Sequence, residues 1–427
     1  MLQLNFFREQ KERILLGLKK RNWSDEDALA IVNEVLGLDE VRRSTQNELD
    51  NTLAESNRLS KQIGDLMRTG QRQEVENIKT GVAELKNKSK NLDEKLNTTA
   101  ESLETILLSL PNIPNGAVPF GKMPEDNEVF QAWNNILPTL PDDALSHWDL
   151  SDKFTVFDLE LGVKLTGGGF PVYRGKGAKL VRALIQFFLD QASDAGYEEI
   201  VPPLLVNEAS ARGTGQLPDK EGQMYYVEKD DLYLIPTAEV PITNILRDVI
   251  LSEKELPVKF CGYTQCFRRE AGSYGAHVRG LNRVHQFDKI EIVQFTHPDK
   301  SYDTLMDMVN HVKSLMEKLE LPYRILKLCG GDMGHASAMT FDFEVWSAAQ
   351  KRWLEVSSVS NFETFQANRL KCRFRDGQGK AQFVHTLNGS ALALGRIIAA
   401  ILENNQTNEG VTMPKALVPY TKFEILD

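Results

Sequence analysis

Residues 259–295 read KFCGYTQCFRREAGSYGAHVRGLNRVHQFDKIEIVQF. Two runs of β-forming residues, 259–266 and 289–295, flank a glycine-rich segment with several arginines, which predicts an antiparallel hairpin with a cationic loop. Arg268 ends the first strand and Glu291 lies on the returning one. An arginine can bind a phosphate or carboxylate through two hydrogen bonds. The segment is therefore equally consistent with a nucleotide-binding hairpin and with an exposed hairpin that carries ordinary surface arginines.

A second informative stretch is VHTLNGSALALGRII at 384–398. It predicts a strand that gives way near Asn388 and Gly389 to an apolar helix, with Arg396 about one turn into that helix. A buried arginine is costly unless an anion meets it. Arg396 is therefore a candidate anion ligand, and the alternative is an arginine that extends to solvent from the helix edge.

A third stretch, GAKLVRALIQFFLDQASDAGYEEIVPP at 177–203, predicts an amphipathic helix, a turn at Gly196 and a strand. It carries no catalytic pattern and suggests an interface. Beyond residue 119, predicted helices alternate irregularly with short strands, which favours an antiparallel α+β domain over a parallel doubly wound one. The predicted helices cover 176–195, 301–319 and 391–404, and further strands cover 232–235 and 353–359.

Residues 41–110 have a different character, since they contain no proline and many charges. Apolar residues recur in steps of three and four, the pattern of a heptad repeat. The predicted seam of the second half comprises Val75, Ile78, Val82, Leu85, Ser89, Leu92, Leu96, Thr99, Leu103 and Ile106. Gly70 can turn the chain, so two antiparallel helices of roughly 45 Å each are expected. Two shorter helices, 6–20 and 25–36, are expected before them, the second with Ser24 as its N-cap.

On periodicity alone, this hairpin is best interpreted as a dimerisation or spacer coiled coil. However, residues 58–95 carry a balance of +3 inside a chain of net charge −10. A cationic arm on an acidic body is suited to contact with an RNA backbone.

The composition, 41% hydrophobic and 26% charged over 427 residues, fits a protein of more than one domain. No apolar run of about 18 residues is present and the N-terminus lacks a secretory pattern. These features predict a cytoplasmic protein that does not associate with a membrane. The four cysteines fit no zinc-binding spacing, so no structural zinc is expected.

In their order, the three stretches resemble motifs 1, 2 and 3 of the class II aminoacyl-tRNA synthetases. Several strings narrow the resemblance to bacterial-type seryl-tRNA synthetases: NEASARGTGQLP (207–218), LIPTAEVPITN (234–244), FRREAGSYG (267–275), RGLNRVHQFDKIEIVQ (279–294), GDMG (331–334), EVSSVSNFETFQANR (355–369) and HTLNGSALALGR (385–396). The resemblance implies a helical tRNA-binding arm at 1–110, with the coiled coil at about 40–108. It also implies a catalytic domain at 111–427, built on a seven-stranded, mainly antiparallel sheet flanked by helices, with motif 3 at about 384–404.

The resemblance further implies that the chain forms seryl-adenylate from serine and ATP with Mg²⁺, then transfers serine to the 3′ end of serine tRNA. Whether a selenocysteine tRNA is charged as well stays open. The implied catalytic residues are Arg268, Glu355 and Arg396. Arg268 would contact the α-phosphate and the serine carboxylate, Glu270 the adenine amino group, and Phe287 the adenine ring opposite Arg396.

The remaining implied site residues fall into four groups. Further ATP contacts are Arg269, Val284, Val356 and Ser357, and magnesium would be held by Glu355 and Ser358. Serine would be bound by Thr237, Ala238, Glu239, Arg268, Glu291, Thr386, Asn388 and Ser390. The long variable arm of the tRNA would contact Arg58, Arg68, Arg72, Lys86, Lys88 and Lys90, and motif 1 would form a homodimer interface.

Three alternatives stay open: a class II enzyme for threonine or proline, a relative that loads a carrier protein, and a scaffold with an inactive catalytic domain. The long arm and the absence of zinc ligands disfavour the second, and the intact motif residues disfavour the third. One departure from the family pattern is Gly330, where relatives often have threonine, and only the loss of one hydroxyl is expected from it.

Overall fold

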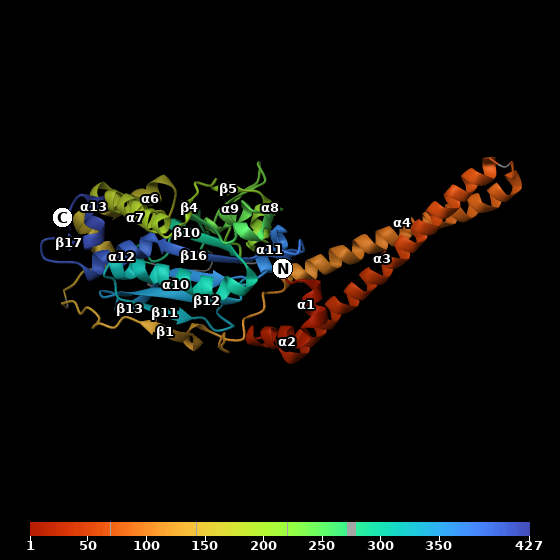
Figure 1. The fold of residues 1–427 in the computed structure, drawn as a ribbon. Helices are drawn as coiled ribbons and strands as arrows, with labels where there is room; N and C mark the ends of the chain where they lie inside the picture. Colours follow the sequence, from red (N-terminus) through yellow and green to blue (C-terminus); the bar gives the residue numbers. More distant parts are fainter. Residues whose placement is uncertain (69, 142, 220, 271–278) are drawn as a thin grey trace. The chain divides into compact units, whose positions relative to one another are not determined.

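The computed structural model describes residues 1–68, 70–141, 143–219, 221–270 and 279–427. They divide into two compact units, each visible in Figure 1. The helical unit comprises 2–19 and 23–111, and the sheet unit comprises residues 1, 20–22 and 112–427. The central part of the predicted cationic loop, 271–278, lies outside the described residues, as do Thr69, Asp142 and Lys220. No described helix is both long and apolar enough to cross a lipid bilayer.

The helical unit is built from two long antiparallel helices and two short ones. They are α1 (Leu4–Glu9), α2 (Lys11–Lys20), α3 (Asp25–Arg68) and α4 (Arg72–Ser109). Gly70 has φ +79°, in the left-handed region, as a turn between the long helices requires. The backbone N–H of Asp27 donates to Ser24 Oγ at 3.0 Å, which confirms Ser24 as the cap of α3.

Two predicted boundaries in this unit are wrong. The helix expected at 25–36 does not stop before Gly37 but continues to Arg68. A glycine inside a helix costs only about 1 kcal/mol relative to alanine, and packing against α4 outweighs that cost. The helix expected at 6–20 is interrupted at Gln10, which has φ −135°.

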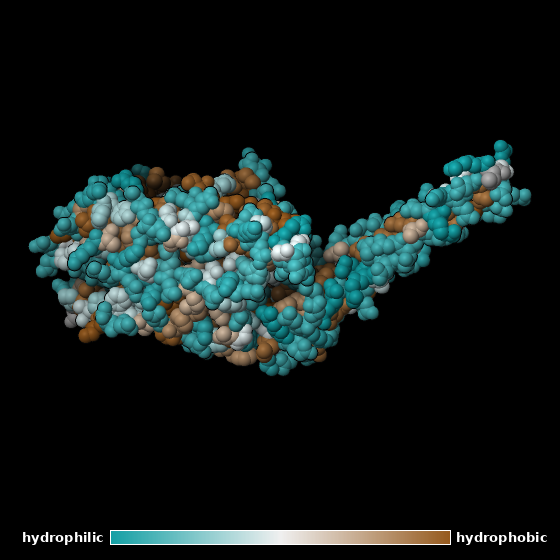
Figure 2. All heavy atoms as spheres, viewed as in Figure 1, coloured by the Kyte–Doolittle hydropathy of each residue, from teal (hydrophilic) through white to brown (hydrophobic). Residues whose placement is uncertain are grey.

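Burial supports the predicted heptad seam: five of its ten residues in α4 are buried, and the other five, Ile78, Leu85, Ser89, Leu96 and Ile106, are half-buried. In α4 the buried residues are Val75, Val82, Leu92, Thr99, Leu103 and Leu107, and in α3 they include Thr45, Leu49, Thr52 and Ser56. The surface of the long helices is mainly hydrophilic, with scattered apolar spots along their length (Figure 2). The seam therefore holds the pair together and leaves the charged residues exposed.

The sheet unit contains a main sheet whose described strands number eight, against the seven expected. Their order is β1 (Glu128–Ala132), β11 (Tyr323–Lys327), β12 (Met339–Ser347), β13 (Arg352–Asn361), β16 (His385–Ala393), β10 (Gln286–Thr296), β9 (Val258–Phe267) and β4 (Glu198–Glu199). All neighbours pair antiparallel except β4 with β9. The antiparallel α+β class is thus confirmed.

Short strands form small additional sheets. They are β2 (Phe157–Asp158) with β3 (Val172–Tyr173), β5 (Leu205–Val206) and β6 (Tyr226–Val227) with β7 (Leu232–Leu234), β8 (Ile250–Ser252) and β15 (Ala381–Phe383) with β14 (Arg373–Arg375), and β17 (Val411–Thr412) with β18 (Ile425–Leu426). The helices are α5 (His147–Phe154), α6 (Leu159–Leu165), α7 (Gly175–Asp194), α8 (Glu208–Thr214), α9 (Glu239–Asn244), α10 (Ser301–Lys318), α11 (Phe365–Leu370), α12 (Leu394–Asn404) and α13 (Val418–Thr421).

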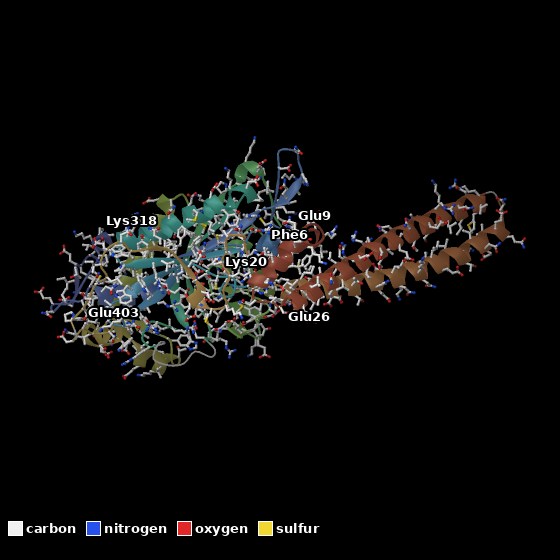
Figure 3. The ribbon with its side chains drawn as sticks, turned by 90° about the horizontal axis from the view of Figure 1, so that it is seen from below. Phe6, Glu9, Lys20, Glu26, Lys318 and Glu403 are labelled. Carbon is white, nitrogen blue, oxygen red and sulfur yellow. The ribbon has the colours of Figure 1, made fainter. Side chains whose placement is uncertain are left out.

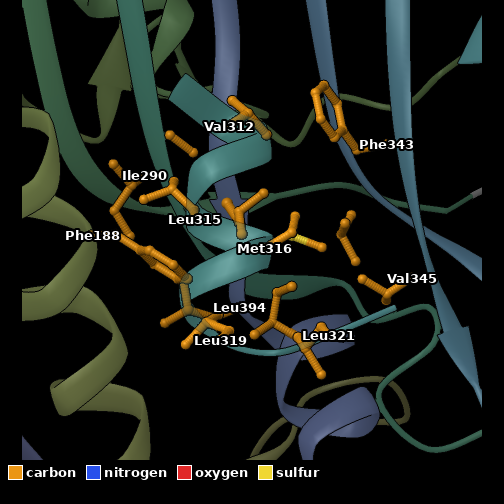
Figure 4. Packing of buried hydrophobic residues seen from close by; sticks show 14 of the residues in the cluster. Phe188, Ile290, Val312, Leu315, Met316, Leu319, Leu321, Phe343, Val345 and Leu394 are labelled. Atoms are coloured by element: carbon orange, nitrogen blue, oxygen red, sulfur yellow. The ribbon is translucent and has the colours of Figure 1, made fainter. Parts of the chain in front are cut away.

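Helices α7, α10 and α12 cover one face of the main sheet (Figure 1). Their apolar side chains pack against inward residues of β10, β12, β13 and β16 in one large core. Figure 4 shows part of this core, with Phe188 of α7, Leu315 and Met316 of α10, and Phe343 of β12. Side chains alternate along a strand, so the residues between these core positions lie on the opposite face.

On β10 this alternation separates two environments. Ile290 and Ile292 belong to the large core, whereas Val293 and Phe295 join a smaller core with Ala238 and residues of α9 and α11. Glu291, which lies between the two isoleucines, therefore faces away from α7, α10 and α12. This arrangement creates the polar region described below.

The boundary predicted near Asn388 is wrong, because β16 continues to Ala393 and α12 begins only at Leu394. Thr386, Asn388 and Ser390 are consequently alternate residues of one strand. Arg396 lies in the first turn of α12, and not about one turn into the helix as predicted.

Gly330 has a steric role that the sequence did not reveal. A Cβ atom at this position would lie 2.1 Å from the carbonyl oxygen of Lys20, within the sheet unit. Lys20, labelled in Figure 3, donates through Nζ to the carbonyls of Gly116 and Val118 at 2.8 and 2.7 Å. A threonine at residue 330 would therefore require this segment to move.

We expect Leu315→Ala to lower the free energy of unfolding by about 3 kcal/mol, because it opens a cavity in the core of Figure 4. Urea unfolding followed by tryptophan fluorescence would measure the change. Leu165→Ala is the matched control, since Leu165 is 67% exposed. Equal losses from both variants would contradict the assignment of the core.

Candidate active site

The carboxylate of Glu291 is the centre of a buried polar cluster on β10. Only 1% of Glu291 is exposed, and its Oε2 accepts from the hydroxyl of Thr237 at 3.0 Å. Lys289 Nζ lies 2.7 Å from the same oxygen, and the amide of Asn388 donates to Oε1. These donors satisfy the polar atoms of the buried carboxylate, and Lys289 forms an ion pair with it.

A second carboxylate, that of Glu239, lies at the start of α9. Gln366 donates to its Oε1 at 2.6 Å and accepts from the hydroxyl of Thr386 at 2.8 Å. Burial and the nearby charge of Glu291 raise the pKa of Glu239 to about 7, although Gln366, Lys289 and Arg268 act in the opposite direction. We name the group formed by Thr237, Glu239, Lys289, Glu291, Gln366, Thr386 and Asn388 the polar cluster.

Two further predicted residues adjoin the polar cluster. Ala238 is fully buried and precedes Glu239 on the chain. Ser390 pairs with Glu291 across β16 and β10, and its carbonyl accepts from the hydroxyl of Ser357. The structure thus brings together in one region every residue predicted to bind the amino acid, including Arg268, whose charge acts on Glu239.

Arg268 follows the last residue of β9 and lies over an aromatic ring. Its guanidinium carbon is 5.3 Å from the ring centre of Phe287, the second residue of β10. Its Nε donates to the carbonyl of Pro236 at 3.4 Å, next to Thr237. An arginine so oriented leaves further N–H donors for an anion, and the ring offers a surface for a planar base.

Glu270 has a left-handed backbone conformation with φ +48°. Its Oε2 lies 2.9 Å from Nε of Arg283, so the two residues close the hairpin at its ends. Arg269 donates its backbone N–H to Gln223, and Val284 is buried. The ends of the loop are therefore fixed by contacts on both strands.

Arg396 and Glu355 form a second charged group. Nε of Arg396 donates to the carbonyl of Asn282 at 2.9 Å, and Nη1 donates to the carbonyl of Glu355. The Glu355 carboxylate is 3.9 Å from Nη1 and its side chain is 53% exposed. Both side chains can thus meet a ligand from solvent.

The residues around Glu355 offer oxygen atoms, which Mg²⁺ prefers. Ser358 forms a hydrogen bond with Asp342, whose Oδ1 is buried and has no hydrogen-bond partner among the described residues. Burial raises the pKa of Asp342 well above its usual range, and the charge of Glu355 raises it further. Among the described residues, no three His, Cys, Asp or Glu side chains form a group that could hold a metal ion. Phosphate oxygens would have to complete a magnesium site here, which fits a metal that arrives with a nucleotide.

Val356 is buried in the core of the sheet, whereas Ser357 is tied to Ser390. Their backbone connects the Glu355 group to the polar cluster. Each of the four cysteines, all of them described, is a buried free thiol.

Sequence reasoning missed Lys289 and Gln366. Lys289 lies two residues before Glu291 on the same strand, so the strand period could have found it. Gln366 contacts Glu239 and Thr386, which are 127 and 20 residues away along the chain, and no local pattern indicates that contact.

The six basic residues predicted to bind tRNA are all exposed on α3 and α4. Several of them are paired with acidic neighbours, such as Arg58 with Glu55 at 2.7 Å and Lys88 with Glu48 at 2.7 Å. Surface pairs of this kind are weak, so an RNA phosphate can compete for these cations.

Comparison with known proteins identifies two family models along the chain. The seryl-tRNA synthetase N-terminal domain matches residues 1–114, and the tRNA synthetase class II core domain (G, H, P, S and T) matches residues 225–405. The serine–tRNA ligase of Salinibacter ruber is 49% identical over 99% of this chain and 98% of its own length. That of Chlorobium phaeobacteroides is 44% identical over the full length of both.

Solved structures agree in fold. Seryl-tRNA synthetase from Pyrococcus horikoshii, complexed with ATP, has a TM-score of 0.88 at 33% identity and covers 100% of this chain and 99% of its own. The cytoplasmic serine–tRNA ligase of Naegleria fowleri, in complex with AMP, has the same TM-score and coverage at 27% identity. Prolyl-tRNA synthetase from Giardia lamblia shares the fold over 64% of this chain, with a TM-score of 0.56 at 17% identity.

The raised pKa of Glu239 predicts a pH-dependent stability. The pKa of Glu239 in the folded protein, about 7, lies above the ordinary value of 4.5. Its contribution to the free energy of unfolding is therefore present below pH 4.5 and is lost as the pH rises through 7. Relative to Glu239→Gln, the wild type should lose at most about 1.4 kcal/mol per pH unit between these limits. Urea unfolding of both proteins between pH 5 and 8 measures this difference, and a difference independent of pH would refute the assignment.

Proposed function

The chain belongs to the seryl-tRNA synthetase family and is a serine–tRNA ligase, and we propose that the polar cluster binds serine while Arg268 and Arg396 bind ATP. The observation that carries this proposal is the pair of buried carboxylates beside Arg268. Two carboxylates and one lysine leave a net negative charge when all are ionised, which suits the ammonium group of an amino acid.

In the proposed complex the serine ammonium lies at the carboxylates of Glu239 and Glu291. The serine carboxylate meets Arg268, and the hydroxyl meets the polar side chains of β16, namely Thr386, Asn388 and Ser390. A site that satisfies a buried hydroxyl discriminates strongly against alanine, because its own polar groups would lose their partners. Thr237 supports this arrangement by holding Glu291.

ATP is proposed to bind with its adenine against Phe287 and its phosphates at the two arginines. Arg268 meets the α-phosphate and Arg396 the γ-phosphate, and Arg396 also borders the adenine. Glu270 accepts from the adenine amino group, and Arg269 and the backbone near Val284 complete the contacts. The structure of the Pyrococcus horikoshii relative, which holds ATP, supports the choice of nucleotide.

Serine would attack the α-phosphorus through its carboxylate oxygen, so that the bond to pyrophosphate breaks and seryl-adenylate forms. Arg268 and Arg396 stabilise the charge that develops on the phosphates and hold the reactants in line. Glu355 and Ser358 would hold Mg²⁺ on the phosphates, where it supplies further positive charge. The 3′-terminal hydroxyl of the tRNA then attacks the seryl carbonyl and AMP leaves.

The helical unit is proposed to bind the long variable arm of serine tRNA. Its exposed cations, Arg58, Arg68, Arg72, Lys86, Lys88 and Lys90, are spread over both long helices. Contacts of this kind go to phosphates and are sensitive to salt. The identity of the tRNA would therefore be read from the shape of its variable arm.

A homodimer is also proposed, with the region that follows α7 at its interface. Strand β4 ends the main sheet, and Val201, which follows it closely, is 88% exposed. An edge strand beside an exposed valine is suited to a second copy of the chain. The proposed location is the cytoplasm, where tRNA, serine and ATP meet.

Replacing the six cations of the helical unit with alanine should lower serine charging about tenfold or more and reduce its salt dependence. ATP–pyrophosphate exchange should not change, since it requires no tRNA. Filter assays of both activities at several salt concentrations test this division. An equal fall in the two activities would show that the cations do not act through tRNA.

Arg396→Ala should lower ATP–pyrophosphate exchange about 100-fold, because a cation that stabilises developing phosphate charge is lost. The KM for ATP should rise while the KM for serine stays near the wild-type value. Arg212→Ala, which removes an exposed arginine of α8 paired with Glu208, is the matched control. If ATP–pyrophosphate exchange by Arg396→Ala stays near the wild-type rate, Arg396 does not have the proposed role in the reaction.

A further inference from the structure

Glu403 is a fully buried carboxylate of α12, and none of the roles described above uses it. It lies in the sheet unit, where Figure 3 labels it. Its Oε1 accepts from the backbone N–H of His147 at 3.1 Å and lies 2.6 Å from Nδ1 of the same residue. Gln350 Nε2 donates to Oε1 at 2.9 Å, and the hydroxyl of Ser347 donates to Oε2. Burial alone raises the pKa of Glu403, but these donors outweigh it and leave the pKa below the usual value.

His147 connects this carboxylate to residues 279–281. Its Nε2 accepts from the backbone N–H of Leu281 at 2.9 Å, so the ring proton belongs on Nδ1, toward Glu403. Gly280 packs so closely that a Cβ atom there would lie 2.2 Å from the imidazole. The neighbouring Trp148 has the guanidinium of Arg279 4.7 Å from its ring centre. Residues 279–281 are thus fixed against the start of α5.

Gln350 makes the second connection from Glu403. It lies in the turn between β12 and β13, and its Oε1 accepts from Nδ2 of Asn282 at 2.9 Å and from Nε of Arg352 at 3.1 Å. Asn282 is buried, and its carbonyl accepts from Nε of Arg396 at 2.9 Å. A continuous chain of hydrogen bonds therefore runs from Glu403 through Gln350 and Asn282 to Arg396.

We propose that Glu403, His147 and Gln350 form a positioning network that fixes residues 279–282 and, through the Asn282 carbonyl, the direction of the Arg396 guanidinium. The network contacts none of the residues proposed to bind serine. It acts on the nucleotide side alone, and this inference rests on the role proposed for Arg396 in ATP binding.

The physical reason is preorganisation. Arg396 lies in the first turn of α12 and its side chain is 30% exposed, so solvent would allow it several rotamers. The hydrogen bond from Nε to the Asn282 carbonyl, together with that from Nη1 to the Glu355 carbonyl, selects one direction before ATP arrives. The Asn282 side chain is held by Gln350 and its backbone N–H donates to the carbonyl of Arg279 at 3.4 Å, so both contacts fix the Asn282 carbonyl. A donor aimed in advance loses less entropy when charge develops on the phosphates.

Gln350→Met tests the network, because methionine keeps the length of the side chain but forms no comparable hydrogen bonds. We expect the KM for ATP in pyrophosphate exchange to rise about tenfold, the effect of losing a hydrogen bond in a charged network. The KM for serine should stay near the wild-type value, whereas the midpoint of thermal unfolding should fall modestly, because the buried Glu403 carboxylate loses one donor. Gln378→Met, in the exposed turn between β14 and β15, is the matched control.

A double-mutant cycle with Arg396→Ala separates the possible outcomes. If Gln350 acts through Arg396, the double variant should be no worse than Arg396→Ala alone. Additive losses would overturn the proposed connection, as would a normal KM for ATP in Gln350→Met or an equal rise in both KM values. If Arg396→Ala itself leaves ATP binding unchanged, it is the proposed role of Arg396 that fails.

Discussion

The antiparallel pairing of β10 with β16 is the constraint on which the rest of the site depends. It sets Glu291 opposite Ser390 and brings Asn388 within hydrogen-bonding reach of the same carboxylate. One face of both strands must be apolar, because α7, α10 and α12 cover it, and the other face must then satisfy a buried carboxylate. Since an unpaired charge at that depth would destabilise the fold, Lys289 and Thr237 contribute to stability as well as to the proposed binding of serine. Fold and site therefore share the same hydrogen bonds.

Much of this arrangement could be predicted from the sequence where a residue acts through its own periodic segment. The heptad seam of the long helices and the strands that carry Arg268 and Glu291 follow from spacing alone, and the resemblance to a family assigned their roles. The helix boundary near Asn388 could not be placed, because Ser390, Ala391 and Leu392 fit a strand or a helix equally well. Only the pairing of β16 with β10 and β13 makes them a strand.

Contacts between distant segments could not be predicted from local sequence patterns, for a different reason. Gln366 joins Glu239 to Thr386, and Gln350 joins Glu403 to Asn282, yet each glutamine lies in a stretch with no repeating spacing. Glutamine is also common on surfaces, so its type alone indicates no buried role. Both residues work because an amide donates and accepts at once, which lets it link a carboxylate to a further polar group.

The charges of the polar cluster are also balanced when no amino acid is bound. With Glu239 protonated below its pKa of about 7, the remaining charged pair of the polar cluster is the ion pair of Lys289 and Glu291, which is neutral overall. An arriving ammonium group favours the ionised form of Glu239, so binding in the proposed position would release a proton from it. A ligand without an ammonium group would leave Glu239 protonated and gain nothing from this change. In the proposed complex the buried carboxylate would thus add selectivity for an α-amino acid at little cost to the unliganded fold.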